Sequence, residues 1–256
     1  MKIKKIIVSQ QQPADLEKSP YHELAEKLRL KIDFRPFIKV EGVSVKEFRQ
    51  FRIDILSHTA VIFTCRTAID HFFRICEELR ITVPDTMKYF CLSESIAFYL
   101  QKYIVYRKRK IFSSKTNFDE LIAIIHKHPE EKILLPLSEP HKQEIPKALE
   151  KQKIKFTKGI FYRTVPSDLS DIDINDYDMI VLYSPAEVKS LAQNFPDFEQ
   201  GEKKIAAFGP TTVNALKEQH LNADVTAPQP KVPSMTMAIE LFLKENAKET
   251  RKQTNP

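Results

Sequence analysis

A short stretch near the C-terminus constrains the fold more than any other part of the chain. An apolar run of strand length, residues 204–208, ends at Gly209, and Pro210, Thr211 and Thr212 follow it. Proline favours the first turn of a helix, and threonine hydroxyls cap the free N–H groups there. The stretch therefore predicts a buried strand, a tight turn and a helix that begins at the carboxyl end of the strand. In α/β sheets, ligands bind at that end.

The same design recurs along the chain. Five further apolar runs of strand length each lead into a turn that carries serine or threonine. These turns lie at Ser9, residues 64–67, residues 93–95, Ser138 and Ser184. Strands that alternate with helices favour mostly parallel sheets with helices on both faces. The sequence therefore predicts an α/β fold.

The order of the elements in the second half repeats the order in the first. In each half, a strand and a helix precede a stretch in which apolar and charged residues alternate, residues 32–40 and 154–165. A matching order of unlike elements indicates an internal duplication. Alternation predicts an extended segment with one face in water, unlike the buried strands elsewhere. We therefore expect these two stretches to connect two domains.

Length and composition limit the classes of protein that fit. A chain of 256 residues suits one large or two smaller domains. Its net charge of +6 suits an anionic ligand but is too small and scattered to demand nucleic acid. Cys65, Cys76 and Cys91 form no CxxC pair and follow no signal peptide, so we expect reduced thiols in a cytoplasmic protein. No apolar segment approaches the ~18 residues of a membrane span.

Patterns that indicate metal or nucleotide chemistry are incomplete. The histidines at 126, 128 and 141 lack the spacing to cysteines or carboxylates that would specify zinc. The five aspartates between residues 168 and 178 do not match an EF-hand loop, and no phosphate-binding glycine pattern occurs. A short strand is expected at residues 103–106, and the basic run 107–110 after it is interpreted as a solvated edge or turn.

Four segments resemble uroporphyrinogen-III synthases, in the order and at the separations found in that family. They are FTCRTA at 63–68, GIFYRT at 159–164, YSP at 183–185 and FGPTT at 208–212. The resemblance covers nearly the whole chain. It implies two similar α/β domains with mostly parallel sheets flanked by helices, joined by a two-stranded β-ladder linker. The domains would be residues 1–38 plus 167–256 and residues 43–162, with linkers at 39–42 and 163–166.

The resemblance implies an enzyme, a cyclising hydro-lyase of heme biosynthesis that uses no metal and no cofactor. Its substrate would be hydroxymethylbilane, which is closed to uroporphyrinogen III with inversion of the terminal pyrrole ring. We expect a cytoplasmic monomer that contacts neither nucleic acid nor membrane. The resemblance also implies hydroxymethylbilane synthase as a transient partner.

The predicted turns suit a substrate that carries eight carboxylates. Helix N-termini bind anions through free N–H groups and the positive end of the helix dipole. Each serine or threonine could instead simply cap its helix, which is the commonest reason for that residue type there. The candidate substrate contacts are Ser9, Thr64, Arg66, Ser93, Ser95, Ser138, Ser184, Gly209, Thr211 and Thr212.

By the family motif, Tyr162 matches the tyrosine that assists loss of hydroxide from the hydroxymethyl group. The alternative is a half-buried cross-strand aromatic residue at a sheet edge. The family pattern usually has serine where this chain has Cys65. A second hypothesis for the whole chain is a non-catalytic two-domain module of the same fold that binds a tetrapyrrole or another polyanion.

Overall fold

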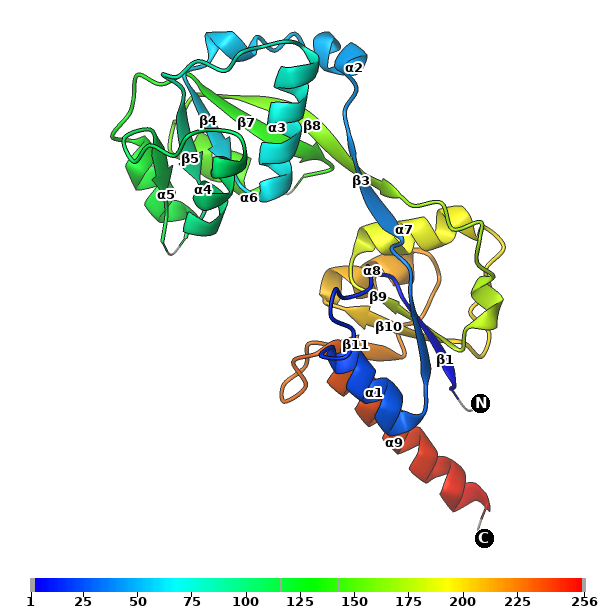
Figure 1. Cartoon of the computed structure of the whole chain (residues 1–256). Coiled ribbons are helices and arrows are strands. Elements are labelled where there is room, and N and C mark those ends of the chain that lie inside the picture. Colours follow the sequence, from blue (N-terminus) through cyan, green and yellow to red (C-terminus); the bar gives the residue numbers. More distant parts are fainter. Residues whose placement is uncertain (1–2, 116, 142, 255–256) are drawn as a thin grey trace. The chain divides into compact units, whose positions relative to one another are not determined.

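The computed structural model describes residues 3–115, 117–141 and 143–254. The chain divides into two compact units, unit 1 with Met1–Lys39 and Val165–Pro256, and unit 2 with Val40–Thr164. Each unit is built on one sheet with helices packed against it (Figure 1). The boundary between the units falls within strands β3 (Ile38–Gly42) and β8 (Phe156–Pro166), which are neighbours in the six-stranded sheet.

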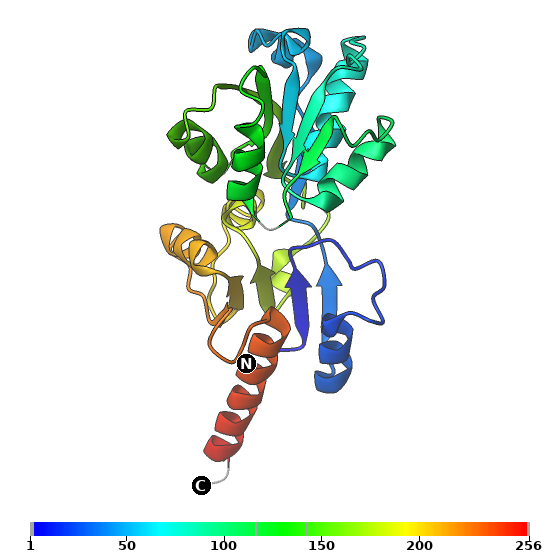
Figure 2. The ribbon, with the colours of Figure 1, turned by 90° about the vertical axis from the view of Figure 1, so that its left-hand side faces the viewer.

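Unit 1 has a five-stranded sheet of order β11-β10-β9-β1-β2, and all four pairings are parallel. Figure 2 shows β1 and β2 running in the same direction. The strands are β1 (Lys5–Val8), β2 (Lys31–Phe34), β9 (Met179–Leu182), β10 (Lys204–Phe208) and β11 (Val225–Ala227). The helices are α1 (Pro20–Leu28), α7 (Pro185–Asn194), α8 (Pro210–Glu218), α9 (Met235–Thr254) and the 3-10 helix η3 (Ile174–Asp176).

Apolar residues of β1 pack on both faces of this sheet. Ile6 and Val8 join a hydrophobic cluster with α1 and α9, whereas Ile7 joins a cluster with α7 and α8. A strand buried on both faces must be apolar at every position, which is why the run shows no alternation.

Unit 2 has the sheet order β3-β8-β7-β4-β5-β6, in which β4–β5, β4–β7, β5–β6 and β7–β8 pair in parallel. Besides β3 and β8, its strands are β4 (Ala60–Phe63), β5 (Lys88–Cys91), β6 (Ile111–Ser113) and β7 (Ile133–Glu139). The helices are α2 (Val45–Gln50), α3 (Arg66–Glu78), α4 (Glu94–Tyr99), α5 (Phe118–Ile125), α6 (Glu144–Lys151) and the 3-10 helices η1 (Ile55–Ser57) and η2 (Leu100–Lys102).

Alternate residues of β4 again reach opposite clusters. Val61 and Phe63 pack with α2, α3 and α4, and Ala60 and Ile62 pack with α5 and α6. The predicted α/β fold with mostly parallel sheets flanked by helices is confirmed. None of the helices among the described residues is long and apolar enough to cross a membrane.

The prediction of a strand at residues 103–106 is wrong. Tyr103 instead follows η2, and its hydroxyl hydrogen-bonds the carboxylate of Asp70, 2.5 Å away. The strand of this region begins at Ile111, after the basic run, where the isoleucine pairs with Tyr89 in the sheet and its side chain is buried. The two tyrosines of the segment gave it an apparent strand propensity, which the contact with Asp70 overrides.

The strand order reverses once in each sheet. In unit 1 the chain passes from β1 to β2 on one side, and β9, β10 and β11 follow on the other. In unit 2 the chain passes from β4 to β5 and β6, and β7 and β8 lie on the opposite side. The junctions β1/β9 and β4/β7 are therefore topological switch points, whose carboxyl ends are where open α/β sheets bind ligands.

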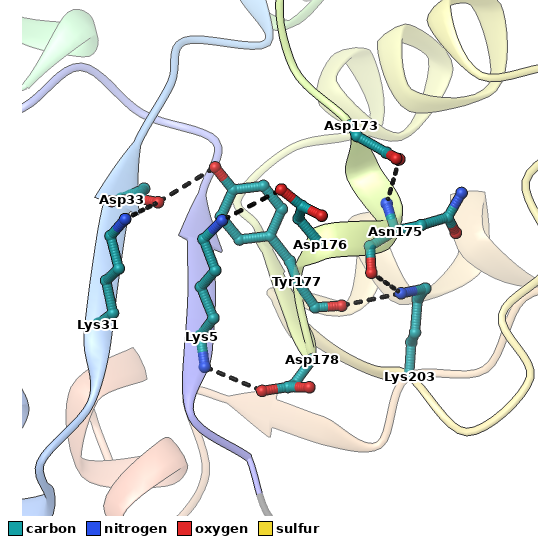
Figure 3. A network of polar contacts seen from close by, with 9 residues as sticks. All are labelled: Lys5, Lys31, Asp33, Asp173, Asn175, Asp176, Tyr177, Asp178 and Lys203. Carbon is teal, nitrogen blue, oxygen red and sulfur yellow. Dashed lines mark hydrogen bonds and ion pairs between the residues drawn. The ribbon is translucent and has the colours of Figure 1, made fainter.

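The acidic run before β9 holds the other end of the unit 1 sheet together (Figure 3). The Asp178 carboxylate accepts hydrogen bonds from the backbone N–H groups of Lys4 and Lys5, at 2.7 and 2.9 Å. The Lys5 ammonium lies 4.4 Å from the Tyr177 ring centre, and the Asp173 carboxylate caps η3. These aspartates are thus used to join strands and cap a turn.

Candidate active site

In unit 2, the phenol of Tyr162 lies at the switch point between β4 and β7. Its hydroxyl is 3.2 Å from the sulfur of Cys65, which follows β4. In the register of β7 and β8, Tyr162 lies opposite Ser138. Burial and the neighbouring Cys65 raise the pKa of Tyr162, and Ser138 opposes them. Tyr162 is only 8% exposed, and its phenol keeps its proton at neutral pH, so it is a potential proton donor.

A β-bulge sets the direction of the Tyr162 side chain. The register of β7 with β8 shifts between Leu137 and Ser138, so Phe161 has no partner of its own. Phe161 and Tyr162 both pack into the hydrophobic cluster that includes α3. Consecutive residues of a regular strand point to opposite faces, so the bulge is what brings both rings to one side.

In unit 1, the carboxylate of Glu187 occupies the switch point between β1 and β9. It accepts hydrogen bonds from the Ser9 hydroxyl at 2.8 Å and from the backbone N–H groups of Tyr183 and Ser184 at 2.5 and 3.1 Å. The residue is 4% exposed, and burial raises the pKa of its carboxyl group against these hydrogen bonds. The Tyr183 hydroxyl in turn pairs with that of Tyr21 on α1.

Glu187 was not among the predicted site residues. The sequence does carry a signal for it, because Ser184 followed three residues later by Glu187 is a capping-box pattern. The structure contains that box at the start of α7.

Most of the predicted hydroxyl groups are engaged within the protein. Ser184 and Ser93 cap α7 and α4, and the Ser95 hydroxyl lies 3.0 Å from that of Ser93. The Ser138 hydroxyl donates to the Pro140 carbonyl, and the buried Ser9 donates to Glu187. These contacts fit the capping and turn roles, and the roles of these five residues as substrate contacts remain predictions.

The start of α8 differs from the expected capping by threonine. Gly209 is the N-cap residue, with a φ of 83° that favours glycine. Thr212 is fully buried and its hydroxyl donates to the Phe208 carbonyl at 2.7 Å, whereas Thr211 is exposed. A cavity of about 430 Å³ adjoins this helix start and is lined by Gly209, Pro210, Val213, Asn214, Thr226, Ala227 and Pro228.

Within the described residues, three helices that follow a strand start without a side-chain cap. They are α8, after Gly209, α3, after Cys65, and α6, after Gln143. Arg66, the first residue of α3, is exposed, and its guanidinium lies 5.3 Å from the ring centre of Tyr99. Thr64 is half-buried just before this start. Uncapped N–H groups and a neighbouring guanidinium are suited to binding carboxylates.

One group of metal-ligating side chains occurs among the described residues. The ligand atoms of His128, Glu130 and Glu131 lie within 4.8 Å of one another. The ammonium of Lys88 is 2.6 Å from Glu131, 3.5 Å from Glu130 and 3.3 Å from His128 Nδ1. A lysine cation already occupies the place of a metal ion, so this group is an internal ion-pair cluster.

The chain is similar to known proteins over most of its length. A family model described as uroporphyrinogen-III synthase HemD matches residues 19–237. A uroporphyrinogen-III synthase from Saccharomyces cerevisiae is 29% identical over 140 residues, covering 48% of this chain and 50% of the relative. One from Schizosaccharomyces pombe is 30% identical over 122 residues, covering 45% of each. The chain thus spans about half the length of the curated relatives that it matches.

Two solved structures show the same fold. The uroporphyrinogen-III synthetase of Helicobacter pylori superposes with a TM-score of 0.59 at 17% identity, over 95% of this chain and 100% of the other. A mutant uroporphyrinogen III synthase of Thermus thermophilus gives a TM-score of 0.50 at 16% identity, over 94% of this chain and 99% of the other. Identities this low speak for the fold alone.

Proposed function

The chain belongs to the uroporphyrinogen-III synthase family, and we propose that it closes hydroxymethylbilane to uroporphyrinogen III as a lyase of heme biosynthesis. The observation that carries this proposal is the buried, protonated phenol of Tyr162 at the switch point of unit 2. The reaction needs one weak acid and many anion contacts, and both kinds of group lie at the carboxyl ends of the sheets.

Tyr162 would act as the general acid. The C–O bond of the hydroxymethyl group breaks, the phenol protonates the departing hydroxide, and water leaves. The resulting azafulvene cation is attacked by the substituted carbon of the terminal ring, and the spiro intermediate fragments and recloses. The proton lost from carbon in the final closure restores the phenol, so the enzyme ends the cycle unchanged.

The carboxylates of the substrate would be bound by two uncapped helix starts, that of α3 in unit 2 and that of α8 in unit 1. At α3 the free N–H groups are joined by the Arg66 guanidinium, and at α8 the tight turn at Gly209 exposes the first N–H groups. Thr64 and Thr211 lie beside these helix starts. Their hydroxyl groups are therefore the predicted contacts that are best placed to bind the same carboxylates. Backbone donors and one guanidinium favour carboxylates without demanding many fixed side chains.

No metal or cofactor takes part in this scheme, because proton donation and ring closure are supplied by the phenol and by the held substrate. We place the enzyme in the cytoplasm, since its three cysteines are free thiols, which persist in reducing compartments.

The test is the isomer of the product. Purified protein would be mixed with hydroxymethylbilane made enzymatically, and the oxidised porphyrins separated by chromatography. We expect the type III isomer in excess over the type I isomer, which forms without enzyme. Type I alone, with retained binding of uroporphyrin, would instead establish a non-catalytic tetrapyrrole-binding module.

A further inference from the structure

The ring of His71 lies flat against the ring of Tyr162. Their centroids are 5.2 Å apart and their planes differ by 16°. His71 is on α3, between Ile69 and Phe72, which are fully buried and fix that helix on the sheet. A stacked aromatic pair is more stable than burial of the same area alone. The contact therefore restricts the tilt of the Tyr162 ring.

Arg74 holds the His71 ring in place. Its Nε donates to His71 Nδ1 at 3.2 Å, and its Nη2 donates to the Val43 and Phe161 carbonyls at 2.7 and 3.4 Å. Because Nδ1 accepts a hydrogen bond, the proton of the neutral imidazole is on Nε2. One guanidinium thus links the imidazole to the backbone of the residue before Tyr162.

The chain leaves room for this guanidinium at Gly42. A Cβ atom at that position would lie 2.5 to 2.7 Å from the guanidinium atoms of Arg74. The backbone of Gly42 has no positive φ, so space for the Arg74 side chain, and not conformation, is what glycine supplies. The network joins Gly42 on β3 and two residues of β8, Phe161 and Tyr162, to His71 and Arg74 on α3.

The charge of His71 also fits the reaction. Burial and Arg74 lower the pKa of His71, opposed by Asp70 and Glu78, so the imidazole is neutral at pH 7. The proposed step creates a cation on the substrate beside Tyr162. A neutral ring stacked on the phenol does not repel that cation, as an imidazolium would.

We propose that His71 is a positioning residue for Tyr162: fixed by Arg74, it holds the phenol ring so that its hydroxyl stays between Cys65 and Ser138. The inference rests on the proposed role of Tyr162 as general acid. His71 does not transfer a proton in this scheme. Its contribution is to the turnover number and not to substrate affinity.

The test compares two substitutions of nearly equal bulk. His71→Phe keeps a flat ring against Tyr162, whereas His71→Leu keeps the volume without the ring. We expect His71→Leu to lower kcat about 3- to 10-fold, the range of a lost aromatic pair, with KM within twofold. His71→Phe, which keeps the ring but not the Nδ1 acceptor for Arg74, should restore part of the loss, and Gly42→Ala, which displaces Arg74, should also lower kcat.

The decisive measurement is the same substitution in a Tyr162→Phe background. If His71 acts through the phenol, His71→Leu causes no further loss of kcat there. Additive losses, or parental kcat in His71→Leu, would overturn the positioning role. A Tyr162→Phe enzyme with parental kcat would overturn the general-acid role first, so the two failures are distinguishable.

Discussion

The hydroxyl of Tyr162 and the sulfur of Cys65 lie 3.2 Å apart, and Cys65 is also the N-cap residue of α3. A thiol is a weak hydrogen-bond acceptor. It therefore leaves the first N–H groups of α3 uncapped and engages the phenol only weakly. In the proposed mechanism, Cys65 thus leaves the start of α3 open to a substrate carboxylate and leaves the proton of Tyr162 available to the departing hydroxide.

Replacing Tyr162 by phenylalanine should remove only the proton donor. General-acid help is typically worth ~10²-fold or more in rate, so kcat should fall by about that factor while KM changes little. The melting temperature should change little, because the ring stays packed against the same neighbours. Steady-state kinetics with isomer analysis checks this prediction.

The matched control is Tyr106→Phe, since Tyr106 is exposed and lies after η2, away from β8. It should keep the parental kcat. A Tyr162→Phe enzyme that turns over at the parental rate would make Tyr162 a packing residue only.

Replacing Cys65 by serine should stabilise unit 2. A serine hydroxyl caps helix N–H groups, which typically contributes about 0.5–1 kcal/mol, and it accepts a hydrogen bond from Tyr162 better than sulfur does. Cys65→Ala, which can do neither, serves as the control. Urea unfolding of the two variants checks the sign of the difference in their unfolding free energies. Equal stability of the serine and alanine variants would show that position 65 cannot cap α3.

The fold was largely predictable because it rests on continuous apolar runs. Ile6, Ile7 and Val8 are all fully buried, and such a run fits only a strand covered on both faces. The strand-to-helix turns after these runs placed most candidate residues at the carboxyl ends of the sheets. Those predictions depended on local sequence only.

The details of the site depended on contacts between distant residues, which local patterns do not encode. The bulge beside Ser138 buries Phe161 and Tyr162 on one side of the sheet. The alternation of apolar and charged residues had predicted a strand with one face in water. Likewise, Glu187 reaches Ser9, 178 positions away, and occupies the switch point of unit 1. The residues next to Glu187 and Ser9 in the sequence do not indicate that these two side chains meet.

Replacing Thr212 by valine should affect stability and not substrate affinity. The buried hydroxyl donates to the Phe208 carbonyl, so its loss should cost about 1 kcal/mol in the free energy of unfolding, with KM unchanged. The exposed Thr211 is the matched control, and Thr211→Val should raise KM with little effect on stability. Paired unfolding and kinetic measurements check both. A raised KM in Thr212→Val at parental stability would return the ligand role to that hydroxyl.

The buried carboxyl group of Glu187 should make stability depend on pH. Because burial raises its pKa in the folded protein, the folded state retains a proton that the unfolded state has already lost. Stability from this group is thus highest below the unfolded pKa and decreases as pH rises through the folded pKa.

Glu187→Gln keeps the shape and a hydrogen-bonding oxygen but cannot titrate. The difference in unfolding free energy between the parent and Glu187→Gln should therefore shift in favour of glutamine as pH rises above the unfolded pKa. A difference that stays constant from pH 4 to pH 8, measured by urea unfolding, would mean that the three hydrogen bonds to the carboxylate fully offset its burial.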